Sequence, residues 1–247
     1  MFFMASLWHL VAFLRLIVFV MANTEKTIFT APESIALPHD AAIDNLFLEA
    51  LHPNRLTVRM HLNASFPTDD KPHGEETWTL LEGLNPGQRY ELRLCWLATQ
   101  PTAFQLQTYT LAEAFESGDL ITSLTVHAYA RRARLTLPES NVLQANRFKA
   151  VTDPTETSLL FLRVQAAADY FSLNKTLMEH VPPVHVDLIL DAYLWNVFPQ
   201  SLVPTAGYIA AIAIFSWFLS GWVYRQFMAY INRNTNQPSI ETVKKSK

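Results

Sequence analysis

The chain has 247 residues, a formal net charge of −3 at pH 7 and an apolar fraction of 50%. This length suffices for one medium-sized domain with accessory segments. The slightly acidic balance, with no basic stripe along the chain, argues against a nucleic-acid partner. The apolar residues are densest in two blocks near the termini, so these blocks bear most on where the chain resides.

The first block predicts a secretory signal peptide over residues 1–22. Its apolar centre runs from Leu10 to Val20 and is interrupted by Arg15. Small residues stand at the −3 and −1 positions of a cleavage site after Ala22. The region before the centre has no Lys or Arg, which leaves an uncleaved anchor as the alternative. Either form sends the following residues into the secretory pathway.

Residues 23–180 show short strand patterns separated by turns. The run from Arg55 to Leu62 alternates apolar and polar residues, which is typical of a half-buried strand. Comparable runs predict further strands, at residues 77–81, 89–96, 104–111, 123–137 and 157–166. We therefore expect a mostly β lumenal domain, an immunoglobulin- or fibronectin-like β-sandwich. Short helices are expected within residues 111–118 and 165–180.

The segment from Leu84 to Trp96 leads from a Pro-Gly turn into a strand. Its residues alternate between two faces, with Tyr90, Leu92, Leu94 and Trp96 on one and Glu91, Arg93 and Cys95 on the other. A tyrosine that opens a strand after such a turn is typical of the tyrosine corner, in which the hydroxyl bonds back to the backbone. We expect Tyr90 and Trp96 to lie in the core.

Cys95 is the only cysteine of the chain, so it cannot form an intrachain disulfide. In an oxidising compartment a lone thiol is either buried and inert or paired with another chain. Its predicted outer face keeps a covalent partner open, while inert packing is the interpretation we favour.

Two glycosylation sequons fall in the part predicted to be lumenal. They begin at Asn63 and Asn174, and neither has proline at its middle position. Both positions agree with the expected topology, although such triplets also arise by chance.

A juxtamembrane segment is expected over residues 181–203, after Pro182 and Pro183. The apolar stretch from Val184 to Phe198 has two interpretations. It forms a last strand of the sandwich, or it forms an interfacial helix that rests on lipid or on a neighbouring protein.

The second apolar block predicts a transmembrane helix over residues 204–224. No charged residue occurs between Asp191 and Arg225, and the block has about the 20 residues that a helix needs to cross hydrocarbon. Aromatic residues flank it as interface anchors, namely Trp195, Phe198, Tyr208, Trp222, Tyr224 and Phe227. Small residues spaced by four are candidates for helix packing, namely Gly207 with Ala211 and Ser216 with Ser220.

Residues 225–247 form the expected cytosolic tail. Arg225, Arg233, Lys244, Lys245 and Lys247 all follow the block, so the positive-inside rule predicts a single-pass type I protein with a lumenal N-terminal domain. Lys244 and Lys245 stand fourth and third from the carboxyl end, as in the dilysine signal by which coat machinery retrieves proteins to the endoplasmic reticulum. A solvated basic tail is the alternative.

No sequence pattern indicates catalysis, a metal site or a cofactor. There is no GxGxxG, HExxH or Gly-x-Ser-x-Gly motif. The acidic pairs at 69–70 and 75–76 bracket Pro72 and Gly74, which favours a solvated loop over a metal cluster. The arginines at 131, 132 and 134 have the chemistry to hold a lipid phosphate, but we expect them on the outer side of a strand or loop.

Three segments resemble the fungal family of GPI-mannosyltransferase II co-activators. They are "APESIALP" (Ala31–Pro38), "LNPGQRYELRLCW" (Leu84–Trp96) and "ATQPTAF" (Ala98–Phe104), followed by one C-terminal span. The resemblance covers about Ala31 to Tyr224. It implies a non-catalytic single-pass protein of the endoplasmic reticulum membrane. Such a protein binds, and stabilises or activates, the multi-pass catalytic subunit that adds the second mannose of the GPI-anchor precursor from dolichol-phosphate mannose.

Two alternatives remain. An early-secretory cargo adaptor, or a chaperone-like type I protein, would also combine a lumenal sandwich, one span and a coat-binding tail. Such adaptors need a heptad coiled coil before the membrane, and the prolines at 182, 183 and 199 interrupt any such helix. A lumenal enzyme acting on glycans or on folding clients is the other alternative, and the sequence presents no site for it.

Overall fold

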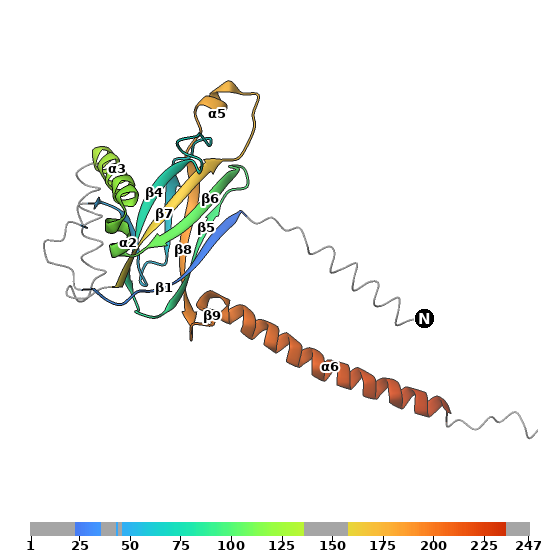
Figure 1. Cartoon of the computed structure of the whole chain (residues 1–247). Coiled ribbons are helices and arrows are strands. Elements are labelled where there is room, and N and C mark those ends of the chain that lie inside the picture. The colour runs from blue at the N-terminus through green and yellow to red at the C-terminus, as the bar shows by residue number, and fades with distance from the viewer. Residues whose placement is uncertain (1–22, 36–42, 44–45, 136–157, 236–247) are drawn as a thin grey trace, which may run out of the picture. The chain divides into compact units, whose positions relative to one another are not determined.

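The computed structural model describes residues 23–35, 43, 46–135 and 158–235. The chain divides into two compact units, residues 1–199 and 200–247. The elements in chain order are β1 (Thr24–Thr30), β2 (Glu49–Leu51), β3 (Thr57–Leu62), β4 (Glu75–Leu84), β5 (Arg89–Trp96), β6 (Thr102–Tyr109), α2 (Leu111–Glu116), α3 (Gly118–Arg134), β7 (Ser158–Ala168), α5 (Lys175–Glu179), β8 (Val184–Leu194), β9 (Phe198–Pro199), the 3-10 helix η2 (Gln200–Leu202) and α6 (Val203–Thr235) (Figure 1).

The first unit consists mainly of two β-sheets. The first sheet has the strand order β1-β5-β8-β3, with β9 paired to β8, and the second has the order β2-β4-β7-β6. This confirms the predicted β-rich fold with two sheets. The immunoglobulin- or fibronectin-like class is not established by this arrangement, because β2 and β4 run parallel and helices cover one sheet.

The main core lies between the two sheets. In β3 every second side chain is buried, namely Val58, Met60 and Leu62. In β5 the inward face holds Tyr90, Leu92 and Leu94, all almost fully buried, and Trp96 packs against them. The predicted faces of this strand are therefore confirmed. Each such burial removes apolar surface from water and contributes about 1.5–3 kcal/mol.

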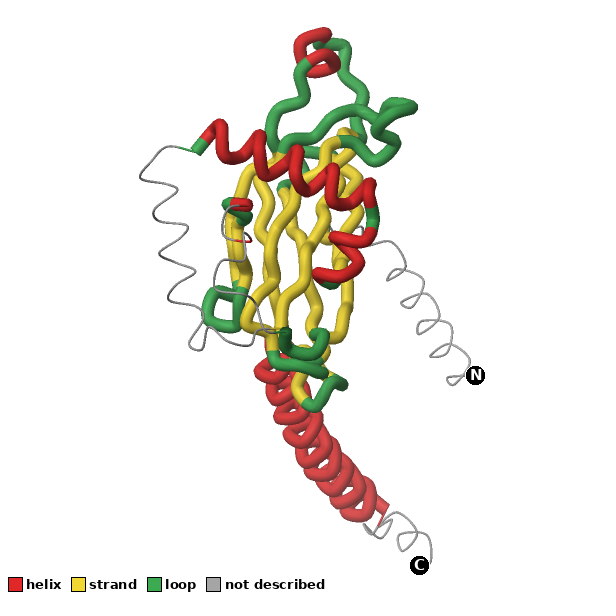
Figure 2. Tube along the Cα trace, turned by 60° about the vertical axis from the view of Figure 1, so that its left-hand side comes forward, coloured by secondary structure: helices red, strands yellow, loops and turns green. Residues whose placement is uncertain are grey.

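A layer of helices covers the outer face of the second sheet. The α2–α3 pair lies across its strands (Figure 2), and a second apolar cluster fills the space between them. Trp78 and Phe161 of the sheet pack there against Ala114 and Leu124 of the helices. Strand β7 is consequently buried on both faces, which explains why its sequence is a nearly continuous apolar run rather than an alternating one.

The strand predicted at residues 123–137 is wrong, because Gly118–Arg134 forms helix α3. The approximate alternation of its residues suggested a strand, yet that alternation does not match the burial. Leu124 and Ala128, four residues apart on one helix face, are the buried residues of α3, and Val126 between them is 63% exposed. The Ser117 hydroxyl caps the helix by accepting a hydrogen bond from the Leu120 amide at 3.5 Å.

The two short helices expected from the sequence have different outcomes. Helix α2 is confirmed, and Thr110 and Glu113 form a capping box at its start. Within residues 165–180, Gln165 to Ala168 instead complete strand β7, and the helix is limited to Lys175–Glu179.

The stretch from Val184 to Phe198 forms a strand of the sandwich, not an interfacial helix. Residues 184–194 form β8, which pairs with β5 on one side and β3 on the other. This stretch, which the sequence placed within a juxtamembrane segment, thus supplies an interior strand of the first sheet.

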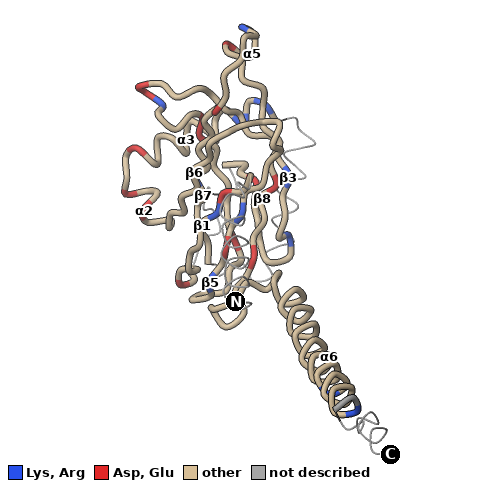
Figure 3. The backbone as a smooth tube through the Cα atoms, turned by 90° about the vertical axis from the view of Figure 1, so that its right-hand side faces the viewer, with Lys and Arg blue, Asp and Glu red and all other residues tan. Residues whose placement is uncertain are grey.

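The second unit contains helix α6. Residues 200–233 are the one helical segment, among the described residues, that is long and apolar enough to cross a membrane. This range includes the predicted span at 204–224. Its charged residues, Arg225 and Arg233, lie in its C-terminal part (Figure 3).

Candidate functional site

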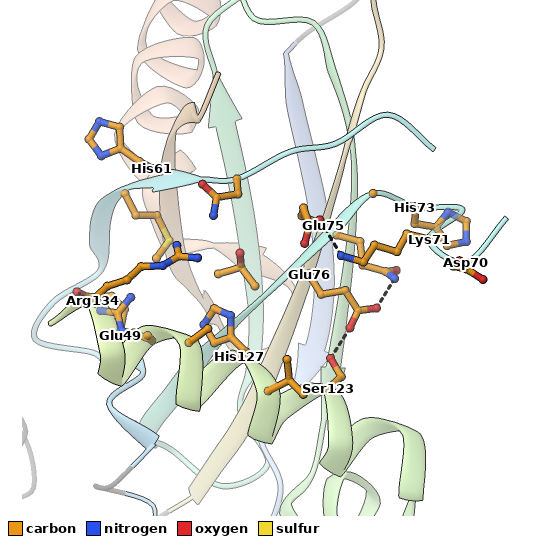
Figure 4. Close-up of a pocket in the computed structure, with 18 of the residues that line it drawn as sticks. Glu49, His61, Asp70, Lys71, His73, Glu75, Glu76, Ser123, His127 and Arg134 are labelled. Atoms are coloured by element: carbon orange, nitrogen blue, oxygen red, sulfur yellow. Dashed lines mark hydrogen bonds and ion pairs between the residues drawn. The ribbon is translucent and has the colours of Figure 1, made fainter. Parts of the chain in front are cut away.

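A polar cleft of about 760 Å³ opens beside helix α3 (Figure 4). It is lined by α3 from Ser123 onward, by strand β3 with the residue that follows it, and by the loop into β4 with the start of that strand. Glu49 of β2 and Gln165 of β7 complete the lining. The titratable groups of the lining are Glu49, Arg59, His61, Asp70, Lys71, His73, Glu75, Glu76, His127, Arg131 and Arg134. The sequence pattern gave no indication that these segments meet.

Glu76 is the centre of a hydrogen-bond network in the cleft. Ser123 of α3 donates its hydroxyl proton to one carboxylate oxygen, and Gln165 donates to the other at 2.8 Å. The Trp78 indole in turn donates to the Ser123 hydroxyl at 3.0 Å. Because Ser123 belongs to the helix and the other groups to the second sheet, the network fastens α3 to the sheet (Figure 4).

His127, one turn after Ser123, is half-buried and neutral near pH 7. Burial lowers its pKa to about 4, and the positive charge of Arg131 acts in the same direction. Its ring is hydrogen-bonded to the backbone of Glu76, while its Nε2 atom is buried without a hydrogen-bond partner.

These groups do not form a relay that activates a nucleophile. Such a relay requires the hydroxyl to donate to an imidazole that a carboxylate orients. Here the Ser123 hydroxyl donates to Glu76 directly, and His127 is bonded to backbone. The arrangement supports the packing of α3 on the sheet.

Two of the three neighbouring arginines secure the last turn of α3. Arg131 donates to the Phe47 carbonyl at 2.5 Å and pairs with Glu49 at 3.0 Å. The Arg132 guanidinium lies 5.9 Å from the centre of the Phe47 ring. Arg134 is exposed at the cleft. The three arginines thus lie on a helix and not on the predicted strand or loop, and these contacts favour a structural role over a lipid-phosphate site.

The acidic pairs around Pro72 do not gather into a metal site. Asp69 and Asp70 are exposed, and Glu75 pairs with Lys71 at 2.7 Å. Among the described residues, no group of three or more His, Cys, Asp or Glu side chains is placed to hold a metal ion.

The two sequons lie in different surroundings. Asn63 is exposed directly after β3, on the lining of the cleft. Asn174 is exposed in the loop between β7 and β8, where its Oδ1 accepts a hydrogen bond from the Thr176 amide at 3.0 Å and caps α5. Glycosylation at both positions stays a prediction.

Cys95 lies on the outer face of the first sheet, as its strand pattern predicts. It is half-buried, and the Thr24 hydroxyl on the neighbouring strand β1 lies 3.6 Å from its sulfur. A covalent partner for this thiol stays a prediction.

The turn between β8 and β9 has an unusual backbone conformation. Trp195 (φ 52°) and Asn196 (φ 58°) both adopt the left-handed conformation. The Asn196 side chain braces the turn, accepting from the Arg89 amide at 2.8 Å and donating to the Gly87 carbonyl at 2.9 Å. As a result Trp195 is held with 87% of its surface exposed.

The four candidate helix-packing residues of α6 are all exposed. At about 100° per residue, the pair Gly207 and Ala211 lies on one side of the helix and the pair Ser216 and Ser220 on the opposite side. One neighbouring helix cannot cover both pairs. The predicted cleavage site at Ala22 and the predicted retrieval residues Lys244 and Lys245 lie outside the described residues.

Comparisons with known proteins agree with the resemblance noted in the sequence. Searches of curated proteins and of solved structures returned no match. Residues 13–130 match the family model described as GPI-Mannosyltransferase II co-activator. The matched range contains β1 to β6 and most of α3, and therefore Tyr90, Ser123 and His127. Over residues 13–130, the chain is therefore similar to the GPI-mannosyltransferase II co-activator family.

Proposed function

We propose that this chain is a non-catalytic membrane subunit that stabilises or activates the GPI-mannosyltransferase that adds the second mannose during GPI-anchor biosynthesis. The family match over residues 13–130 is the observation that carries this proposal. The catalytic subunit, a multi-pass protein, supplies the chemistry, and this chain holds it in a competent state.

In this proposal the chain resides in the endoplasmic reticulum membrane as a single-pass type I protein. Helix α6 crosses the bilayer, and the β-rich unit lies in the lumen. The apolar stretch and the basic residues that follow it, Arg225 and Arg233, support this orientation. Both sequons then lie on the glycosylated side of the membrane.

The chemistry of the cleft supports a role without catalysis. Two of its titratable groups, Glu76 and His127, are engaged in fastening α3 to the second sheet. In this proposal the chain acts by binding the catalytic subunit through its surfaces.

Helix α6 offers two surfaces to a multi-pass partner. Small residues let helix backbones approach closely, and the two predicted pairs lie on opposite sides of α6. A multi-pass protein, which has several helices, can contact both sides at once. The exposed Trp195 is suited to the lumenal headgroup region, since tryptophan is enriched at membrane interfaces.

A cargo adaptor is the weaker alternative. Adaptors of that kind need a coiled coil before the membrane. Between Phe171 and Pro199 the chain instead forms the five-residue helix α5 and the strands β8 and β9.

Affinity purification of the full-length chain in mild detergent tests the proposal. We expect the multi-pass mannosyltransferase to be recovered with it in near-stoichiometric amount. As a matched control, a chain in which α6 is replaced by an unrelated apolar helix of equal length shows whether the span carries the contact. Recovery of secretory cargo and coat proteins without the mannosyltransferase would refute the proposal.

A further inference from the structure

The loop between β7 and β8 exposes large apolar side chains. Phe171 is 82% exposed and Leu173 is 92% exposed. They precede α5 at the end of the β-rich unit opposite β9 (Figure 1). Exposed apolar side chains that cluster in this way mark a surface that another group covers.

The loop has a defined internal structure that directs these side chains outward. The Tyr170 hydroxyl donates to the Leu177 carbonyl at 2.8 Å, and the Tyr170 ring packs edge-to-face on Phe66 with a centroid distance of 5.2 Å. The Ser172 amide contacts the Met178 sulfur at 3.3 Å. Tyr170 and Ser172 thus hold the loop together. Phe171, which lies between them, and Leu173, which follows Ser172, stay exposed.

The sequon at Asn174 follows Phe171 by three residues. The backbone N–H of Asn174 donates to the Ser172 hydroxyl at 3.1 Å, so the sequon is tied into the same loop. Its Oδ1 atom makes the capping bond to Thr176, whereas N-glycosylation modifies the other terminal atom, Nδ2. A glycan on Asn174 is therefore compatible with the cap of α5.

We propose that an N-linked glycan on Asn174 covers this loop, with the C–H face of its first sugar packed on the Phe171 ring and Leu173 beside it. An aromatic ring presents an apolar, electron-rich face that the C–H groups of a sugar can cover. The inference rests on the proposed function in one respect, the lumenal location of the β-rich unit.

The modification itself is an ordinary glycosyl transfer. The donor is an oligosaccharide linked to a lipid pyrophosphate, and a transferase of the lumen catalyses the step. A bond forms between Asn174 Nδ2 and C1 of the first sugar, the bond between C1 and the pyrophosphate oxygen breaks, and Nδ2 loses one proton. The lipid pyrophosphate is the leaving group, and no oxidation or reduction occurs.

The sequon at Asn63 provides a matched control within the same chain. The residue three positions before it is Met60, which is buried in the core. The backbone of Ser65, the third residue of that sequon, is bonded to Ala166 and Ala168 of strand β7. A glycan on Asn63 therefore has no exposed aromatic ring at the corresponding position.

The experiment is a double-mutant cycle on the full-length chain purified in detergent. Thr176→Ala removes the sequon but leaves the Asn174 cap in place. Phe171→Ala removes the aromatic ring on which the first sugar is proposed to pack. We expect mass spectrometry to find Asn174 glycosylated and Thr176→Ala to lower Tm by about 2–4 °C when Phe171 is present. The same substitution should change Tm by less than half as much in the Phe171→Ala background.

Asn63→Gln should shift Tm equally with and without Phe171, and Phe171→Trp should keep the effect of the Asn174 glycan. An unmodified Asn174, or an equal effect of Thr176→Ala in both backgrounds, would overturn the inference. If Asn63 is glycosylated and Asn174 is not, the inference fails while the lumenal location holds. If neither asparagine is glycosylated, the lumenal location fails as well.

Discussion

The hydroxyl of Tyr90 accepts a hydrogen bond from the backbone amide of Asn85 at 3.1 Å, across the turn that leads into its own strand. The same hydroxyl donates to Gln88 at 3.2 Å, and the Tyr90 ring stacks on Phe29 in the core with a centroid distance of 5.8 Å. This is the tyrosine corner that the sequence predicts. Burial raises the pKa of this hydroxyl, so it stays protonated throughout the neutral range.

Tyr90→Phe should keep the ring and lose both hydrogen bonds. We expect the free energy of unfolding to fall by about 1–2 kcal/mol, because the Asn85 amide loses its partner in a partly buried turn. Denaturant unfolding followed by intrinsic fluorescence measures the change. Tyr129→Phe, at a side chain that is 78% exposed, is the control and should be neutral. Equal stability of Tyr90→Phe and the parent would contradict the role of the corner.

Gly74 and Gly87 form a matched pair for substitution. Both have positive φ, at 76° and 71°, but a Cβ atom at Gly74 would lie 2.0 Å from the Ala166 carbonyl oxygen, while one at Gly87 would meet nothing within 4 Å. Gly87→Ala should cost about 1 kcal/mol through backbone strain alone. Gly74→Ala should cost well over 3 kcal/mol, because it must also push β4 away from β7. Similar costs at the two positions would show that the close contact at Gly74 is absent.

His127 should make the stability of the β-rich unit depend on pH. Its pKa is lowered from 6.5 to about 4 in the folded chain, so the unfolded chain binds the proton more readily between these values. The stabilisation is fully present above pH 6.5 and is lost as the pH falls toward 4, up to about 3 kcal/mol in all. The pKa of His52 is also lowered by burial and adds to the same trend.

His127→Gln isolates the effect of His127, because His52 is the same in both proteins. Tm measured between pH 7 and pH 5 should fall less steeply in the variant than in the parent. The pKa of Asp187 is lowered by its hydrogen bond to Arg59, so that carboxylate begins to lose its contribution only below this range. Identical slopes for the two proteins would show that His127 is not buried as a neutral group.

The two small-residue pairs of α6 can be tested separately because they lie on opposite sides of the helix. Gly207→Leu with Ala211→Leu fills one side, and Ser216→Leu with Ser220→Leu fills the other. We expect each double variant to reduce recovery of the multi-pass partner several-fold, measured by quantitative mass spectrometry of purifications in mild detergent. Ile209→Leu with Ile212→Leu, which conserves volume, should leave recovery unchanged. Full recovery with both small-residue variants would place the contact elsewhere.

Local patterns predicted the parts of the fold that depend on one strand or one turn. The alternation in β3 is confirmed residue by residue, because the strand has one face in the core and one outside. In β5 the inward face is confirmed by Tyr90, Leu92 and Leu94, although Glu91 on the other face is also buried. The same rule failed for α3. Its approximate alternation suggested a strand, but Leu124 and Ala128 pack at helical spacing on a sheet that the sequence pattern does not reveal.

The pairing of the strands and the position of the cleft could not be predicted either, because both depend on contacts between distant parts of the chain. Nothing local indicates that β8 pairs with both β3 and β5, which lie about 130 and 100 residues earlier in the chain. The network that joins Glu76, Ser123 and Gln165 likewise depends on α3 lying across the second sheet. Each of these residues is unremarkable in its own stretch of sequence.

The central claim is that this chain supports addition of the second mannose without performing it. The direct measurement is the profile of radiolabelled GPI precursors in cells depleted of the chain, compared with cells in which the full-length chain is restored. The account predicts that precursors with one mannose accumulate on depletion and disappear on restoration. An unchanged precursor profile in depleted cells would contradict it.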